Sequence, residues 1–168
     1  MSSARWMRTM LRDKRSGKIA VVAHCILNQN SRVFGLAKRS SAIAEIVKFL
    51  TLNDMGIIQM PCPELTYAGV LRKSQTKNQY DNAKFRSHCK KIAEETVAQI
   101  QEYSKGKIKA RIIIGVDGSP SCGITDSGIL IEELRSTLKE QGLTVPFYGI
   151  RYERLSKDLT KLKKLIRD

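Results

Sequence analysis

Four cysteines are the residues whose type and spacing point most clearly to chemistry. Cys25, Cys62 and Cys122 each follow a short apolar run that predicts a β-strand, whereas Cys89 lies within a predicted helix. Parallel strands end at one edge of their sheet, so we expect the three thiols to meet there. Three thiolates suit a metal site with one open coordination position, the pattern of catalytic sites. The alternative is that these cysteines are small hydrophobes buried at strand ends.

Two distinctive loop sequences surround Cys62 and Cys122. Residues 61–64 read Pro-Cys-Pro-Glu, so prolines fix the backbone on both sides of Cys62 and a carboxylate follows two residues later. Residues 118–123 read Gly-Ser-Pro-Ser-Cys-Gly, a loop of small residues that leads towards a predicted helix. Backbone N–H groups and hydroxyls in such a loop can approach a cluster sulfur or an anion. Both loops therefore have the composition of a binding site.

The elements that must position these loops alternate strand and helix. The periodicity predicts four strands, at 19–23, 57–60, 112–116 and 145–150, and four main helices, at 40–53, 81–104, 126–141 and 156–167. We expect Ser40 or Ser41 to cap the first helix and Asp81 the second. The order predicts one α/β domain over residues 18–168, with three layers around a parallel sheet of four strands or slightly more. Residues 1–17 form a basic N-terminal extension that a helix would suit.

Three short motifs occur in a fixed order along the chain: His24-Cys25-Ile26-Leu27, Cys62-Pro63-Glu64 and Ser119-Pro120-Ser121-Cys122-Gly123. In this order they resemble the TudS-type 2-thiouracil desulfurase (desulfidase) family, and the second and third motifs are the specific ones. The motifs cover few residues, but their positions span most of the domain.

The resemblance implies a [4Fe-4S] cluster held by Cys25, Cys62 and Cys122, with one iron that has no protein ligand. It also implies an enzyme that converts the C=S group of a thiolated pyrimidine to C=O by net hydrolysis, releasing sulfide without redox change. Iron is a soft acceptor for sulfur, which makes this chemistry reasonable. The substrate would be a 2-thiouracil type of base, free or as thiouridine in a nucleoside or tRNA.

Such a reaction needs an acid or base to activate water and to handle the ring nitrogen or sulfur. Glu64 is the first candidate because its motif tethers it beside the cluster; a structural hydrogen bond or salt bridge is the alternative. Ser119 and Ser121 are candidates for orienting substrate or donating to cluster sulfur, and loop shaping is their alternative. Asp117 is a weaker acid or base candidate that would otherwise cap the loop.

The stretch after Cys25 departs from the family pattern. Ser31 stands where the family shows a second cysteine, while Arg32 and Gly35 fit. The segment after Glu64 differs as well. The family shows there a run of Gly and Pro that ends in Arg, whereas this chain reads Leu-Thr-Tyr-Ala-Gly-Val-Leu-Arg. Substrate contacts are expected from four residues: Asn28 and Asn30 at a pyrimidine edge, Tyr67 by stacking, and Arg32. Turn formation and core packing are the alternatives for the asparagines and Tyr67.

Three further residues are expected to be structural. Cys89 lies mid-helix, away from the predicted edge. His24 precedes a proposed ligand but would face the other side of an ideal strand, so we expect a hydrogen-bonded core residue. His88 is expected at the surface.

The net charge of +14 in 168 residues is concentrated in three segments: residues 1–18 carry a net +5, residues 71–91 a net +6 and residues 151–168 a net +4. This distribution favours a polyanion partner, RNA first of all, with tRNA bound through these three segments as the specific candidate. Solvated surface and an anionic membrane are the alternatives.

The chain shows no secretory signal and no apolar run long enough to span a membrane, which indicates a cytoplasmic protein. In a reducing compartment its cysteines would serve metal binding, catalysis or burial rather than disulfides. The main alternative function is a basic RNA-binding or sulfur-handling accessory module whose cysteines bind zinc or are structural.

Overall fold

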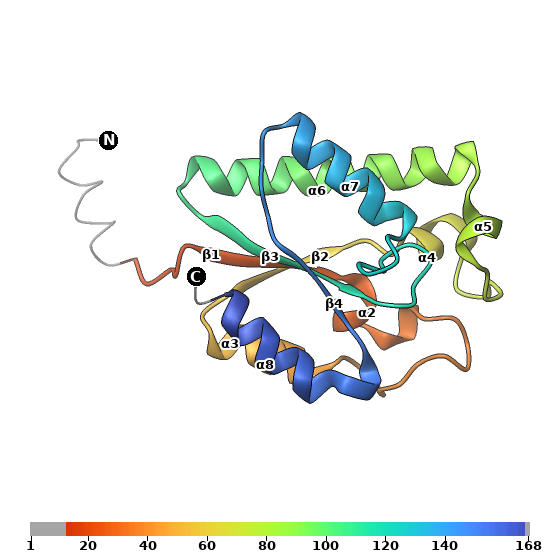
Figure 1. Ribbon diagram of the computed structural model, residues 1–168, viewed down its shortest axis with the longest axis horizontal. Coiled ribbons are helices and arrows are strands. Elements are labelled where there is room, and N and C mark those ends of the chain that lie inside the picture. Colours follow the sequence, from red (N-terminus) through yellow and green to blue (C-terminus); the bar gives the residue numbers. More distant parts are fainter. Residues whose placement is uncertain (1–12, 167–168) are drawn as a thin grey trace.

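The computed structural model describes residues 13–166 and contains one parallel four-stranded sheet (Figure 1). Its strands are β1 (Lys18–Ala23), β2 (Gly56–Met60), β3 (Lys109–Val116) and β4 (Phe147–Ile150), in the spatial order β2-β1-β3-β4. The predicted α/β class and parallel sheet are thus confirmed. Residues 1–12 of the expected N-terminal extension lie outside the described part of the chain.

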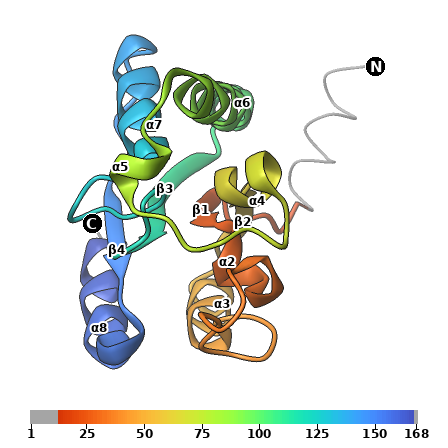
Figure 2. The ribbon, with the colours of Figure 1, turned by 90° about the vertical axis from the view of Figure 1, so that its right-hand side faces the viewer.

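Helices cover both faces of the sheet and give the three expected layers (Figure 2). One face carries α6 (Ala83–Lys105) and α7 (Ile129–Glu140), and the other carries α3 (Ala44–Leu52) and α8 (Leu155–Leu165). Strands buried on both faces read as continuous apolar runs, which is why the strand sequences do not alternate. Within residues 13–166, no helix is both long enough and apolar enough to cross a membrane.

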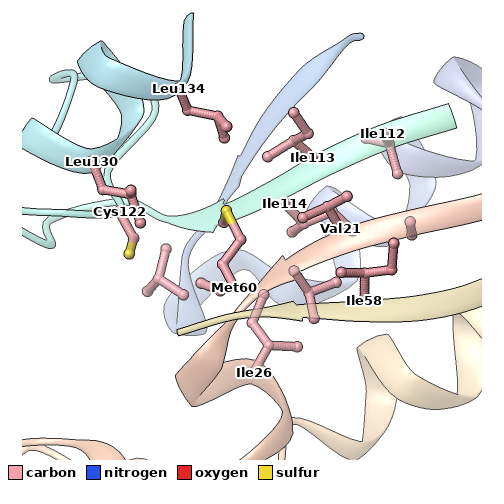
Figure 3. Packing of buried hydrophobic residues seen from close by; sticks show 14 of the residues in the cluster. Val21, Ile26, Ile58, Met60, Ile112, Ile113, Ile114, Cys122, Leu130 and Leu134 are labelled. Carbon is pink, nitrogen blue, oxygen red and sulfur yellow. The ribbon is translucent and has the colours of Figure 1, made fainter. Parts of the chain in front are cut away.

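The core lies between the sheet and the helices (Figure 3). Val21 of β1 and Ile113 of β3 are fully buried, as is Leu130 of α7. Successive side chains on a strand point to opposite faces, so each strand supplies both apolar layers. Cys122 belongs to this same cluster, because the loop that carries it packs against the sheet.

Short helices that the periodicity did not predict connect the main elements at the carboxyl edge of the sheet. They are α2 (His24–Leu27), η1 (Gln29–Ser31), α4 (Pro63–Ala68), α5 (Lys77–Tyr80) and η2 (Tyr152–Arg154). Each is shorter than two turns, so none carries the repeated apolar spacing that identifies a helix in a sequence. Two of them, α2 and α4, follow β1 and β2 and carry the chain away from the strands at Cys25 and Cys62.

Two helix starts differ from the prediction. The first helix begins at Ala44, because Ser41 and Ile43 instead pair through their backbones with Gln29 and Ile26 at 2.6 and 2.8 Å. The long helix α6 is capped by Asn82, whose side chain accepts from the Phe85 N–H at 3.0 Å. The predicted cap Asp81 instead ends α5.

Two further elements are shorter than predicted. The third main helix starts at Ile129 rather than 126, because Gly128 N–H donates to the Gly123 carbonyl at 2.9 Å and closes a turn in the preceding loop. Strand β4 covers only Phe147–Ile150 of the predicted 145–150.

The strand order places a crevice at the carboxyl ends of β1 and β3. From β1 the chain moves first to β2 on one side and then crosses back to β3 on the other. Ligands of open α/β sheets bind where the winding direction reverses in this way.

Candidate functional site

A cavity of about 140 Å³ opens at this reversal point, and all three strand-end cysteines line it. Cys25 is the second residue of α2, immediately after β1. Cys62 is the N-cap of α4, with Pro63 at the first helical position. Cys122 lies in the loop between β3 and α7 and is buried. The fold therefore brings together the three thiols that the sequence singled out, while Cys89 is buried in α6 and lies outside this cavity.

The three thiols share an apolar environment. Burial raises the pKa of the Cys25 thiol to about 11, and Arg32 opposes this shift. Burial also raises the pKa of Cys62, and raises that of Cys122 well above its ordinary value, with neighbouring thiols adding to the effect for Cys122. Without a bound metal, all three groups are therefore protonated near neutral pH, and metal binding must displace their protons.

The loop that carries Cys122 is organised by the hydroxyl of Ser119. This oxygen accepts from the backbone N–H of Ser121 at 3.2 Å and from that of Cys122 at 3.0 Å. The Cys122 carbonyl in turn accepts from Val116 N–H at 3.1 Å. The loop approaches β3 so closely that a Cβ on Gly115 would lie 2.1 Å from the Cys122 carbonyl oxygen. The absence of a side chain at Gly115 therefore allows the loop to pack this closely and to bury Cys122.

Glu64 lies at the cavity wall within a network of polar side chains. Its Oε1 accepts from the Ser121 hydroxyl at 2.9 Å and from the Ser119 hydroxyl at 3.5 Å. Its Oε2 lies 3.7 Å from Nε of Arg72. Glu64 of helix α4 and the two serines of the β3–α7 loop, which the sequence placed in one site, thus contact one another. Oε1 is occupied by hydroxyl donors, and Oε2 faces the arginine.

Arg72 is a site residue that the sequence analysis missed, since it was counted only within the basic segment 71–91. Its side chain is 3% exposed, and one terminal nitrogen donates to the Ser31 carbonyl at 2.6 Å. The same nitrogen lies 4.0 Å from Sγ of Cys62. The sequence did carry a signal for Arg72, because the segment after Glu64 ends in Arg as the family pattern does, although the run of Gly and Pro before it is absent.

Arg32 lines the cavity from the other side and is held by Tyr152, a second residue that the sequence analysis missed. The Arg32 guanidinium donates to the Tyr152 hydroxyl at 2.9 Å and lies 5.2 Å from the centre of its ring. Gln29 links this pair to the first cysteine, because its amide donates to Tyr152 at 2.9 Å and to the Cys25 carbonyl at 2.6 Å. Tyr152 follows β4 and is 120 residues from Arg32, so no local pattern could have indicated the contact.

Five predicted site residues do not line the cysteine cavity: Ser121, Asp117 and the three expected substrate contacts Asn28, Asn30 and Tyr67. Asn28 caps η1 by accepting from Asn30 N–H at 3.1 Å, and the two side chains also pair at 3.0 Å. Tyr67 points its ring edge at Phe85, with 5.1 Å between ring centroids. These contacts match the turn and packing alternatives for the three residues.

Asp117 makes the contacts of a loop cap. Its carboxylate accepts from Ile124 N–H and Thr125 N–H at 3.0 Å each and from the Thr125 hydroxyl at 2.6 Å. Burial alone would raise its pKa, but these donors and Arg151 hold the pKa below the usual range.

The two histidines also differ in part from expectation. His24 begins α2 and lines the cavity, and its buried Nδ1 has no hydrogen-bond partner within residues 13–166, so the prediction of a hydrogen-bonded core residue is wrong. Burial lowers the pKa of His24, which favours the neutral ring. His88 is half-buried rather than fully on the surface, and its Nε2 lies 2.7 Å from the Thr66 hydroxyl.

The cavity wall contains buried nitrogens that are not hydrogen-bonded. Nδ1 of His24 and the Nε atoms of Arg32 and Arg72 have no hydrogen-bond partner among the described residues, and all three residues line the cavity. Buried polar groups are normally paired, so unpaired nitrogens around three thiols fit a bound group with sulfur or anionic acceptors. Among the described residues, no three His, Cys, Asp or Glu side chains converge on a single metal ion. A cluster takes each thiolate on a different iron, and therefore does not require such convergence.

Comparisons with known proteins give the family and the fold of the chain. The model of the family described as "Putative 2-thiouracil desulfurase" matches residues 17–167. The uncharacterized protein MJ0003 of Methanocaldococcus jannaschii is 41% identical over 150 residues, covering 89% of this chain and 94% of that protein. A solved structure, the [4Fe-4S]-dependent thiouracil desulfidase TudS, covers 88% of this chain and 99% of its own, with a TM-score of 0.51 at 17% identity. The last comparison establishes a shared fold.

Proposed function

Since the chain belongs to the 2-thiouracil desulfurase family, we propose that it is an iron–sulfur desulfidase acting on a thiolated pyrimidine. The reaction replaces C=S by C=O, with water supplying the oxygen and sulfur leaving as sulfide, so no electron donor is needed. The observation that carries this proposal is the cavity in which three cysteine thiols meet Glu64 and buried nitrogens that are unpaired among the described residues. The base would be of the 2-thiouracil type, free or as thiouridine.

We assign Cys25, Cys62 and Cys122 as the ligands of a [4Fe-4S] cluster, which leaves one iron without a protein ligand. When bound, the cluster would supply a soft acceptor for the sulfur of the substrate. Arg72, beside Cys62, and Arg32, beside Cys25, place positive charge next to the thiolates. This charge offsets part of the unfavourable energy of buried thiolates.

Glu64 is assigned as the acid or base that moves the proton. Its Oε1 is fixed by Ser121 and Ser119, so we assign the proton exchange to Oε2, which lies 3.7 Å from Nε of Arg72. Oε2 takes a proton from the attacking water and returns it to the ring nitrogen or the departing sulfur. The serines orient the carboxylate.

Substrate contact is assigned first to Arg32, which lines the cavity. Asn28, Asn30 and Tyr67 stay predictions as substrate contacts, and Asp117 stays a prediction as an acid or base. Their observed contacts support structural roles at least as well.

The ligand assignment predicts which cysteines bind iron. After anaerobic reconstitution, the wild-type protein should be brown and contain about four irons and four acid-labile sulfides per chain. Each of the variants C25A, C62A and C122A should lose most of this iron, because a ligand is removed. C89A is the matched control and should retain it. Iron and sulfide quantitation, together with visible absorbance, gives the answer.

The activity assay then follows sulfide release from 2-thiouracil, 4-thiouridine and thiolated tRNA. A wild-type protein that stays colourless and iron-free after reconstitution contradicts the cluster. A fully loaded protein that releases no sulfide from any of the three contradicts the desulfidase.

A further inference from the structure

A second hollow adjoins the cysteine cavity and is not used by the proposed reaction. Its wall includes Asn30, Phe34, Arg39 and Val70, and it shares Arg32 and Val33 with the cysteine cavity. We call it the Phe34 hollow. A site built for a free pyrimidine base alone would have no need of this extension.

The wall of the Phe34 hollow combines exposed apolar side chains with an exposed amide. Phe34 is 73% exposed and Val70 is 47% exposed, and both lie on loops beside the opening of the site. Exposed apolar groups gathered in a concave surface mark a binding site more often than a solvated one. Asn30 adds an exposed amide that can meet the edge of a base.

The loops that form the hollow are free of acidic residues. Residues 24–44 and 65–80 contain no Asp or Glu, although both segments carry Lys and Arg. Arg39 pairs with Glu45 at 2.9 Å, but this ion pair is exposed on both sides and stabilises the fold little, so a phosphate can replace it. Lys38 and Lys73 are also exposed in these loops. The charge around the hollow therefore complements a polyanion.

The two loops are joined beside the cysteine cavity. A guanidinium nitrogen of Arg72, from the second loop, donates to the Ser31 carbonyl of the first at 2.6 Å. This buried contact holds Val70 and Phe34 on the same hollow. The arrangement is therefore part of the folded site rather than a chance meeting of two surface loops.

We propose that the Phe34 hollow binds the nucleotide next to the thiolated one, so that the substrate is a thiolated pyrimidine within a single-stranded polynucleotide. The inference rests on the proposed desulfidase. The neighbouring base stacks on the Phe34 ring, Asn30 meets its edge, and the connecting phosphates lie by Arg32 and Arg39. A membrane patch of the same composition would be convex, whereas this surface is hollow and leads into the site.

The test measures binding of a fluorescent, unthiolated hexauridylate to the full chain by anisotropy at low salt. Alanine in place of a stacking aromatic weakens single-strand binding, so F34A should raise Kd about tenfold. F34W should bind as the wild type does, whereas F34L, which is apolar but cannot stack, should bind as poorly as F34A. Y103A is the matched control, because Tyr103 is a 40% exposed aromatic at the far end of α6.

Circular dichroism and thermal melting of each variant verify that it is folded. Equal binding by wild type, F34A and F34L overturns the proposal. It is also overturned if hexauridylate does not bind while vesicles of anionic phospholipid do and F34L keeps that binding. Because the probe carries no sulfur, these results are independent of turnover. Absence of sulfide release from free 2-thiouracil would instead count against the proposed function.

Discussion

Glu64 shows how the site distinguishes the two oxygens of one carboxylate. Oε1 accepts from two serine hydroxyls of the Cys122 loop, and Oε2 faces a buried arginine. The side chain is only 13% exposed, so its orientation is set by these partners rather than by water. The carboxylate therefore has a fixed orientation, which the proposed acid or base role requires.

Replacing this carboxylate should separate catalysis from cluster binding. We expect E64Q to lower kcat for sulfide release by about 10²–10⁴-fold, because the amide keeps the shape but cannot carry the proton. Iron content should stay at the wild-type level, since Glu64 is not a ligand. The control E45Q changes an exposed carboxylate on α3 and should leave kcat unchanged. Iron loss in E64Q parallel to the loss of activity would make the role of Glu64 structural.

Cys89 is the buried thiol outside the site, and it makes stability depend on pH. Burial raises its pKa from 9.0 to about 12, with Glu133 adding to the shift. The folded chain therefore keeps this proton at a pH where the unfolded chain has lost it. The resulting stability is fully present below pH 9.0 and is lost as pH rises towards about 12.

Urea unfolding of metal-free wild type and C89A between pH 8 and pH 11 tests this residue. C89A should be less stable at pH 8, because a buried side chain is shortened. Above pH 9 the difference between the two proteins should shrink by about 1.4 kcal/mol per pH unit, the value for one ionising group. A difference that stays constant over this range would show that Cys89 does not titrate as its burial requires.

At the scale of elements, the β3–α7 loop is held against the strand it leaves. Backbone contacts to Val116 and Ser119 set its course, and Gly115 and Gly128 leave room for it. A Cβ on Gly128 would lie 2.3 Å from the Ser121 carbonyl carbon. The loop therefore has one position, and its cysteine and serines are placed together.

A methyl group on the strand should displace the whole loop. In G115A the new Cβ would overlap the Cys122 carbonyl at 2.1 Å, and backbone cannot move aside as a side chain can. We expect a loss of about 1–3 kcal/mol in the free energy of unfolding, and reduced iron binding.

Chemical denaturation and iron quantitation measure both effects. G106A is the control, because Gly106 has φ −84° and its nearest contact would be at 3.4 Å. Its stability should stay within about 1 kcal/mol of wild type. Wild-type iron content in a destabilised G115A would show that Cys122 can bind from a shifted loop.

At the scale of the whole molecule, part of the basic charge is already used inside the fold. Arg86 pairs with Asp81, Glu132 and Glu133, and Lys77 also pairs with Glu132. In the last basic segment, Arg151 and Arg154 approach Asp117, and Arg154 also pairs with the buried Asp158. Fewer basic side chains are therefore free to bind a polyanion than the count of Lys and Arg indicates. Among the described residues, the basic side chains without an ion pair are mainly lysines.

Salt dependence tests whether this excess serves a large substrate. Counterion release makes binding of a polynucleotide fall steeply with salt, whereas an uncharged base has no such term. Between about 50 and 200 mM KCl, kcat/KM should fall by at least tenfold for thiolated tRNA and by less than twofold for free 2-thiouracil. If salt lowered kcat/KM equally for both substrates, the basic residues would be solvated surface and would not bind the substrate.

The sequence by itself determined the parallel α/β class, most of the four main helices and the three cysteines at strand ends. Apolar runs and helical periodicity carry that information locally. The same local rules failed at the first helix, because Ser41 and Ile43 are held through their backbones by Gln29 and Ile26, 12 and 17 residues away in the chain. They also gave no sign of the short helices, which lack a full apolar period.

Only the tertiary structure decided which side chains share the cavity. No single segment of the sequence specifies the strand order. The placement of β1 between β2 and β3 brings the three cysteine loops together. Arg72 and Tyr152 enter the site through contacts with Ser31 and Arg32, which are 41 and 120 residues away. Burial and pairing at such separations follow from packing of the whole sheet. For that reason the thiols could be read from the sequence, but the charges that surround them could not.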